Sequence, residues 1–223
     1  MTTPKSGSGS SRQLVATLDI AAKVLLVVLL LVAVVYPDLG NLRGKAMGFR
    51  AVAYPMGAAI VPLLWWWLWR PRGRAYPWLG DLLVTLPWLT DTLGNRLDLF
   101  DTVWWFDDWM HFMNWGLLTA GFVVLTLGRD APLGAVVERA LAFGPVTAIG
   151  WELGEYVAFV RHSPELVTAY TDTLGDLALG SIGAVVGALL VHAAAQRGSL
   201  KEAPVTGRRA PRLDAQRSSQ PAT

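Results

Sequence analysis

One short stretch of the sequence, residues 101–116, concentrates side chains that can exchange protons or bind a metal ion. It reads DTVWWFDDWMHFMNWG and places Asp107 and Asp108 four and three positions before His111. Side chains three or four residues apart share one face of a helix, so either carboxylate can stand beside the imidazole. A histidine beside a carboxylate can act as a general base or as a metal ligand. This stretch is therefore the first candidate for a reactive site.

Tryptophans around this stretch indicate where it lies relative to a membrane. Trp104, Trp105, Trp109 and Trp115 surround the acids, and an apolar run continues to Leu127. Tryptophan favours the boundary between lipid and water. Polar chemistry at the rim of a membrane helix is therefore the first hypothesis for this segment.

The composition supports a membrane protein. The chain has 223 residues, of which 53% are hydrophobic and 16% charged, and this is too apolar for an ordinary soluble domain. It has no cysteine, which excludes disulfides, thiol nucleophiles and thiolate metal sites. A metal ion would need histidine and carboxylate ligands. The net charge of +2 comes from basic residues in the tails and loops, which indicates topology and not nucleic-acid binding.

Apolar runs of spanning length recur along the chain. The third run contains Asp81, Pro87 and Asp91, so we expect it to be embedded in the membrane with a kink at the proline. The sequence therefore predicts an all-α fold, a polytopic bundle of about six transmembrane helices. The expected spans are residues 18–36, 51–69, 78–93, 107–127, 135–160 and 173–192.

The two ends of the chain are polar and the basic residues are distributed unevenly. We expect disordered tails at residues 1–13 and 197–223, on either side of a transmembrane domain at residues 14–196. With an inside amino terminus, most Lys and Arg residues fall on one side of the membrane. The positive-inside rule then predicts a plasma-membrane protein with both termini cytoplasmic. The exceptions are Arg43, Lys45, Arg50, Arg96 and Arg161.

Alternating span directions bring the polar residues of three spans to one membrane face. The fourth span begins, the fifth ends and the sixth begins at that face, which lies outside when both tails are inside. An ionised side chain near a helix centre costs about 2.5–3.5 kcal/mol, so such a group needs pairing, protonation, water or a cation. The residues concerned are Asp107, Asp108, His111, Glu152, Glu155, Asp172 and Asp176.

A divalent cation is one ligand that would suit this set. Carboxylates with one histidine fit zinc, manganese or magnesium. Like charges spaced three or four residues apart repel, which a shared cation or proton relieves. The candidate metal ligands are His111, Asp108, Glu152, Glu155, Asp172 and Asp176, and the candidate catalytic residues are His111, Glu152 and Asp108. The chain lacks HExxH and the ExxH of di-iron bundles, so no established ligand motif supports the assignment.

Structural roles compete with this interpretation. Asp107, Asp108 and Asp172 lie at predicted helix amino termini, where acids favour the helix dipole. Asp81 and Asp91 are interpreted as boundary residues. The small residues of the last span include GxxxG at residues 183–187, which favours close packing within the bundle over dimerisation.

Part of this pattern resembles a known group of proteins. Asp-x-x-His-Phe at residues 108–112, Glu152, Asp172, Asp176 and the glycines of residues 183–187 are similar to the VanZ-like and YjdF-like families. These are small, largely uncharacterised bacterial integral membrane proteins, and the similarity covers residues 104–190. The resemblance implies a helical membrane fold and a site at this position, but it does not imply a reaction.

The predicted function is an integral membrane protein whose outward-facing His/carboxylate cluster binds a cation or a polar head group. One version is a lipid-modifying hydrolase, with His111 as ligand or base and Glu152 as general acid/base. The alternatives are a proton- or ion-coupled small transporter and a structural or accessory envelope protein. An enzyme needs the cluster at one depth, whereas a transporter needs polar residues that continue to the other side. Membrane lipids are the expected partners, and the oligomeric state stays open.

Overall fold

The protein folds as a bundle of long helices. The computed structural model describes residues 7–39, 42–43, 45–158 and 160–200, and every regular element within these ranges is helical. The all-α fold is therefore confirmed. The long helices are α1 (Gly7–Val35), α2 (Met47–Leu64), α3 (Trp78–Arg96), α5 (Phe106–Thr126), α6 (Leu133–Ala158) and α7 (Ala169–Gln196). The short ones are η1 (Trp65–Trp69), η2 (Arg70–Arg72), α4 (Leu99–Thr102), η3 (Val160–His162) and η4 (Pro164–Val167).

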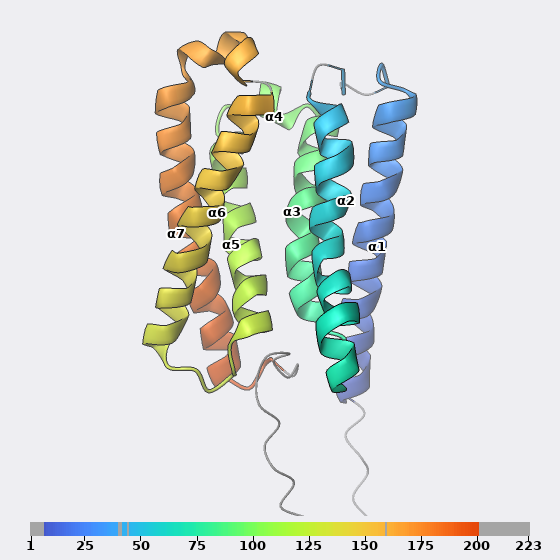
Figure 1. Cartoon of the computed structure of the whole chain (residues 1–223), viewed down its shortest axis with the longest axis vertical. Helices are drawn as coiled ribbons and strands as arrows, with labels where there is room; N and C mark the ends of the chain where they lie inside the picture. The colour runs from blue at the N-terminus through green and yellow to red at the C-terminus, as the bar shows by residue number, and fades with distance from the viewer. Residues whose placement is uncertain (1–6, 40–41, 44, 159, 201–223) are drawn as a thin grey trace, which may run out of the picture.

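The long helices run alternately up and down and form two groups of three (Figure 1). Helices α1, α2 and α3 make one half, helices α5, α6 and α7 make the other, and α3 packs against α5 between them. The beginning of α1 and the end of α7 lie at the same end of the bundle (Figure 1). Short connections make consecutive long helices antiparallel, and an even number of long helices returns the chain to the end where it began.

Four segments are long and apolar enough to cross a membrane: Ser10–Val35, Met47–Arg72, Leu133–His162 and Ala169–Gln196. Helices α3 and α5 fall outside this set because they carry the polar residues of the bundle interior. With 19 and 21 residues, they extend about 28 and 31 Å at a rise of 1.5 Å per residue. Both lengths approach the thickness of a bilayer's hydrocarbon core, so these central helices are long enough to cross it beside their apolar neighbours.

The ends of the bundle differ from the expected tails at one point. Helix α1 begins at Gly7, so residues 7–13 extend the first helix and do not belong to a disordered tail. Helix α7 ends at Gln196, where the domain was expected to end. Residues 1–6 and 201–223 of the expected tails lie outside the described residues.

Glycines bring α5 and α7 into close contact. A Cβ atom at Gly183 would overlap the backbone of Phe112, and one at Gly187 would overlap the backbone of Gly116. The small residues therefore pack within the bundle, as their spacing predicts. This contact lies next to His111 in α5, and it holds α7 close enough for an acid of that helix to reach the imidazole.

An aromatic cluster joins the two halves. The ring of Tyr54 in α2 lies 5.2 Å from that of Trp88 in α3 and 6.1 Å from that of Trp151 in α6, measured between centroids. Trp88 and Trp151 lie 6.0 Å apart. These rings pack on the apolar core between α1, α2 and α3, so Trp151 couples α6 to the opposite half.

Candidate functional site

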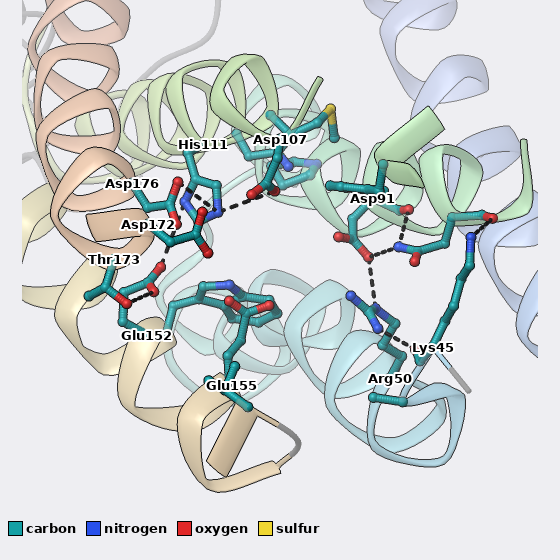
Figure 2. A pocket seen from close by; sticks show the side chains of 18 of the residues that line it. Lys45, Arg50, Asp91, Asp107, His111, Glu152, Glu155, Asp172, Thr173 and Asp176 are labelled. Carbon is teal, nitrogen blue, oxygen red and sulfur yellow. Dashed lines mark hydrogen bonds and ion pairs between the residues drawn. The ribbon is translucent and has the colours of Figure 1, made fainter. Parts of the chain in front are cut away.

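A cavity of about 630 Å³ lies between the two halves, at the end where α2, α5 and α7 begin and α3 and α6 end. Its volume falls in the range of sites for small organic ligands. Figure 2 shows acids and His111 on one side of this space, with Arg50 and Lys45 on the other. The convergence of polar residues expected from the span directions is therefore seen in the structure.

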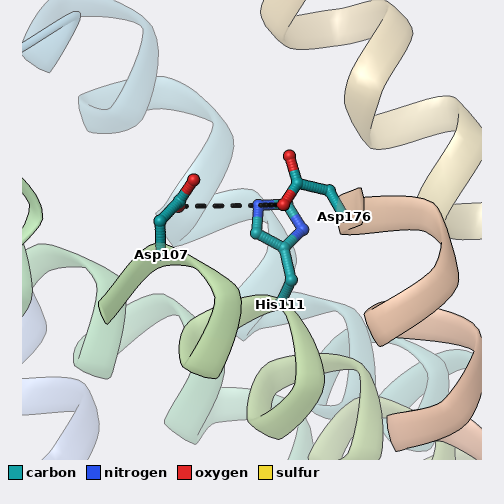
Figure 3. Close-up of side chains that lie close together, drawn as sticks. All are labelled: Asp107, His111 and Asp176. Atoms are coloured by element: carbon teal, nitrogen blue, oxygen red, sulfur yellow. Dashed lines mark ion pairs between the residues drawn. The ribbon is translucent and has the colours of Figure 1, made fainter. Parts of the chain in front are cut away.

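His111 is the centre of the acidic side. Its Nε2 lies 3.7 Å from Asp107 Oδ1 and 3.7 Å from Asp176 Oδ1 (Figure 3), and its Nδ1 lies 3.7 Å from Glu152 Oε1. These distances exceed those of hydrogen bonds. His111 Nδ1 is buried and has no hydrogen-bond partner among the described residues. The carboxylates thus surround the ring without being bonded to it.

The spacing of these atoms suits a shared metal ion. Two groups of three residues offer ligand atoms that lie within 4.8 Å of one another. The first group is Asp107, His111 and Asp176, and the second is His111, Glu152 and Glu155. Two ligand atoms on a tetrahedral ion with bonds of about 2.1 Å lie about 3.4 Å apart. The separations of 3.7 Å around Nε2 are close to that value. Small side-chain movements would complete such a site.

The other candidate residues take different positions. Glu152 is fixed by Thr173, whose hydroxyl donates to Glu152 Oε2 at 3.2 Å. Asp176 is 4% exposed and accepts no hydrogen bond within the described part of the chain. Glu155 and the exposed Asp172 line the cavity. Glu152, Glu155 and Asp176 therefore lie around His111, and Asp172 lines the same cavity.

Asp108 does not join them. It is exposed and is not among the residues that line the cavity, whereas Asp107 lines it. Asp107 lies one helical turn before His111 on the inward face of α5, whereas Asp108 lies on its exposed face beside the exposed Trp109. The carboxylate beside the imidazole is consequently Asp107, which was expected in the cluster but was not among the candidate ligands.

The opposite side of the cavity contains basic residues that the sequence analysis left out of the site. Arg50 Nε donates to Tyr54 Oη at 2.9 Å and to Asp91 Oδ2 at 3.0 Å, and Tyr54 Oη donates to Asp91 Oδ2 at 2.5 Å. Asp91 was interpreted as a boundary residue, but it is the counter-ion of a largely buried arginine. The sequence contains a signal for this contact, because Arg50 and Tyr54 are four residues apart where the second span begins.

Lys45, in the connection before α2, is also paired. Its Nζ lies 2.7 Å from Asp98 Oδ1 and 2.6 Å from Asp101 Oδ2. Burial opposes the charge of Lys45, but hydrogen bonds with Asp101 and Asp98 outweigh it and raise the pKa of the lysine. The ammonium group is therefore held in its charged form by two carboxylates.

The charges around the cavity do not balance. Seven carboxylates line it, namely Asp91, Asp101, Asp107, Glu152, Glu155, Asp172 and Asp176. The lysines and arginines that line it are Arg43, Lys45 and Arg50. If all are ionised and His111 is neutral, the cavity carries an excess of four negative charges. Bound cations or protons are the physical means of neutralising such an excess.

A second buried charged cluster lies between α1 and α3, on the side of the cavity toward the beginning of α3. Lys23 Nζ lies 2.6 Å from Asp19 Oδ1 and 2.9 Å from Asp81 Oδ1, and it donates to Thr85 Oγ1 at 2.7 Å. Tyr76 Oη donates to Asp81 Oδ2. Asp81 lies in the first turn of α3, as expected of a boundary residue, and it is also a buried ion-pair partner. The sequence did not identify Asp19, near the start of an apolar run, as part of this cluster.

Comparison with known proteins agrees with a membrane location. Residues 19–197 match the family described as "Predicted membrane protein (DUF2238)". No curated protein and no solved structure matches the chain. The VanZ-like and YjdF-like names suggested by the sequence resemblance are not confirmed. The match spans all six long helices, in whole or in part, and the chain belongs to this family of membrane proteins.

Proposed function

We propose that the protein binds a divalent cation through Asp107, His111 and Asp176, and that the bound ion serves a lipid-modifying hydrolase activity. One observation carries the proposal: two buried or half-buried carboxylates stand 3.7 Å from His111 Nε2, too far for hydrogen bonds and close to the spacing of ligands on one ion. The excess of carboxylates around the cavity supports it further. With both termini in the cytoplasm, the site faces the extracytoplasmic side of the plasma membrane.

Glu152 has a different role in this proposal. A metal-bound histidine usually donates its second ring N–H to a carboxylate, which fixes the tautomer and the ring orientation. His111 Nδ1 faces Glu152 Oε1, and Thr173 holds the other oxygen of that carboxylate. If this 3.7 Å gap closed to a hydrogen bond, Glu152 would orient the imidazole so that Nε2 could present its lone pair to an ion.

The chemistry follows from the number of protein ligands. One imidazole and two carboxylates leave a tetrahedral ion with an open position. When bound there, such an ion would supply a water molecule acidic enough to attack an ester near neutral pH. The chain's own contribution is to position that water beside the carboxylates that line the cavity, which can accept its proton.

Ion-coupled transport is the second candidate, and the cluster of Asp19, Lys23 and Asp81 favours it by continuing polar residues along the bundle. Trp88 lies between this cluster and Asp91 along α3, and it packs against Tyr54 and Trp151. An apolar layer of this kind interrupts a polar path, which supports a site that opens to one side.

A structural role alone would require the acids to find basic partners within the fold. Arg96 ends α3 and Arg161 follows α6 at the same end of the bundle, but neither forms an ion pair with a carboxylate of the cavity among the described residues. The cavity acids of α5, α6 and α7 are left without a lysine or arginine partner among the described residues, which supports ligand binding over an accessory scaffold.

Elemental analysis of the detergent-purified full chain tests the proposal. We expect about one divalent ion per chain in the wild type and its loss in His111→Ala and Asp176→Asn. Two matched controls should keep the metal: His192→Ala, a histidine near the end of α7, and Asp108→Asn, an exposed acid next to the site. A wild type without metal, or a His111→Ala variant that retains it, would contradict the proposal.

The same preparations separate hydrolysis from transport. Metal-loaded protein in lipid nanodiscs should release head groups or fatty acids that mass spectrometry detects, and His111→Ala should not. Metal-dependent proton or ion flux in proteoliposomes, without any change in the lipids, would instead support the transporter.

A further inference from the structure

The cavity has room and charge that the proposed ion does not use. A volume of about 630 Å³ is many times the roughly 30 Å³ share of one water molecule. Glu155 and Asp172 line this space, and neither carboxylate forms a hydrogen bond or ion pair with another described residue. Figure 2 shows Glu155 projecting from α6 into the region between His111 and Arg50. A second, larger cationic ligand would find unpaired carboxylates here.

Aromatic rings add to the attraction for an organic cation. The cavity is lined by Tyr54, Trp88, Phe100, Trp115, Trp151 and Tyr156. The face of an aromatic ring attracts ammonium groups within about 6 Å of its centre. Unpaired carboxylates beside aromatic rings therefore favour an amine over an inorganic anion in this part of the cavity.

Arg50 could bind the anionic end of a zwitterionic ligand. Its side chain is 9% exposed and lines the cavity, and its described hydrogen bonds come from Nε and Nη1. Nη2 has no acceptor among the described residues. A phosphate oxygen is a natural partner for the free edge of a guanidinium group.

The position of the cavity indicates a lipid as the source of this ligand. Trp104 and Trp105, just before Asp107 in sequence, are 89% and 48% exposed. Exposed tryptophans mark the level of lipid head groups. Asp107 and His111 follow within two helical turns, so the cavity lies where head groups lie.

We propose that the cavity binds the head group of an aminophospholipid, with its primary ammonium between Glu155 and Asp172 and its phosphate toward Arg50. The inference deepens the proposed function, since the ion would occupy Asp107 and Asp176 and leave these acids free. A primary ammonium donates three hydrogen bonds, which carboxylates accept, whereas a trimethylated ammonium donates none. The cavity therefore selects phosphatidylethanolamine over phosphatidylcholine.

Competition among lipids tests this selection. The full chain is placed in nanodiscs that contain equal amounts of phosphatidylethanolamine, phosphatidylcholine and phosphatidylglycerol, and the lipids retained on release from the disc are identified by native mass spectrometry. We expect about a tenfold preference for phosphatidylethanolamine, which corresponds to about 1.4 kcal/mol. Equal retention of phosphatidylcholine would overturn the amine assignment. Displacement by soluble ethanolamine at the same effective concentration would overturn the lipid source.

Variants localise the effect. Glu155→Gln and Asp172→Asn should abolish the preference, whereas Glu138→Gln, an acid near the other end of α6, should retain it. Size-exclusion profiles check that each variant is folded. A preference that survives both Glu155→Gln and Asp172→Asn would overturn the site.

Metal content measured in the same samples separates the two proposals. Glu155→Gln with normal metal and no lipid preference supports the amine site. Loss of metal in Glu155→Gln would make Glu155 a ligand and overturn the amine site. A wild type without metal that still prefers phosphatidylethanolamine would contradict the metal site and support the amine site.

Discussion

Two groups of buried acids, one in each half of the bundle, differ in whether the chain supplies their counter-ion. Asp19 and Asp81 are 1% and 0% exposed, and the ammonium of Lys23 lies 2.6 and 2.9 Å from them. Asp176 is 4% exposed, and the nitrogen it faces is His111 Nε2 at 3.7 Å. A buried carboxylate without a counter-ion is costly. The acids of α1 and α3 are therefore neutralised by a lysine of the chain, whereas those of α5, α6 and α7 remain available to bind a cation or a proton.

The two walls of the cavity differ in the same way. Arg50 and Lys45 are paired with acids on the side formed by α2, α3 and α4. On the side formed by α5, α6 and α7, the acids have no lysine or arginine within ion-pair distance among the described residues. Ion pairs within the chain thus stabilise one wall, and bound cations or protons are left to neutralise the other.

Removal of Lys23 should have the largest effect on stability. Lys23→Met leaves Asp19 and Asp81 buried without a cation, and breaking a buried pair in this way costs about 3–5 kcal/mol. Denaturant unfolding of the purified protein in detergent micelles measures the loss. The triple variant Asp19→Asn, Lys23→Met, Asp81→Asn removes all three charges and should recover most of it. Equal instability of the triple variant would show that shape, and not charge, holds this cluster together.

Disruption of the contact between α5 and α7 should rank second. Gly183→Ala places a Cβ against the backbone of Phe112, and overpacking of this kind costs about 1–3 kcal/mol. Separation of the helices would also move Asp176 away from His111, so metal content should fall together with the unfolding midpoint. Gly175→Ala is the matched control on the same helix, because a Cβ there meets no atom within 4 Å. A fall in stability with full metal content would show that the site does not depend on this contact.

The sequence predicts the depth of side chains better than their direction. Alternating spans bring His111, Glu152 and Asp176 to one end of the bundle, and the structure agrees. The rotation of α5 selects Asp107 over Asp108, and this rotation depends on packing against α3 and α7 that no local pattern contains. Spacing of three or four residues allows both acids, so tertiary packing had to decide between them.

The ion pairs of Lys23 and Arg50 could not be predicted because their partners lie far away in the sequence. Lys23 meets Asp81 across 58 positions, and Arg50 meets Asp91 across 41. An apolar run that contains one acid or one lysine looks like a helix end, because a charge in lipid is expected to lie near the interface. The partner that allows such a charge to be buried lies on another helix, which single-sequence periodicity does not identify.

Neutralisation of Asp176 should have an effect opposite in sign to neutralisation of Asp81. In metal-free protein, Asp176→Asn removes one of several like charges and keeps the side-chain volume, so stability should rise by up to about 1 kcal/mol. Asp81→Asn removes a partner of Lys23 and should lower stability. Unfolding of both variants after chelation provides the comparison. A destabilised Asp176→Asn would indicate an unrecognised structural bond to that carboxylate.

Removal of Lys45, which is half-buried and paired with Asp98 and Asp101, should have the smallest effect on stability. The effect should be visible in how stability declines at alkaline pH. Its folded-state pKa is raised by Asp101 and Asp98, so its stabilising contribution is fully present below the ordinary lysine pKa and is lost as the pH rises through the folded value. Asp101 is 62% exposed, so solvent screening should keep the contribution within about 1 kcal/mol. Lys45→Gln should lower stability at neutral pH and flatten its decline at alkaline pH. Arg43→Gln, which breaks an exposed pair with Asp38, should change neither quantity, and a decline equally steep in Lys45→Gln would assign the alkaline transition to another group.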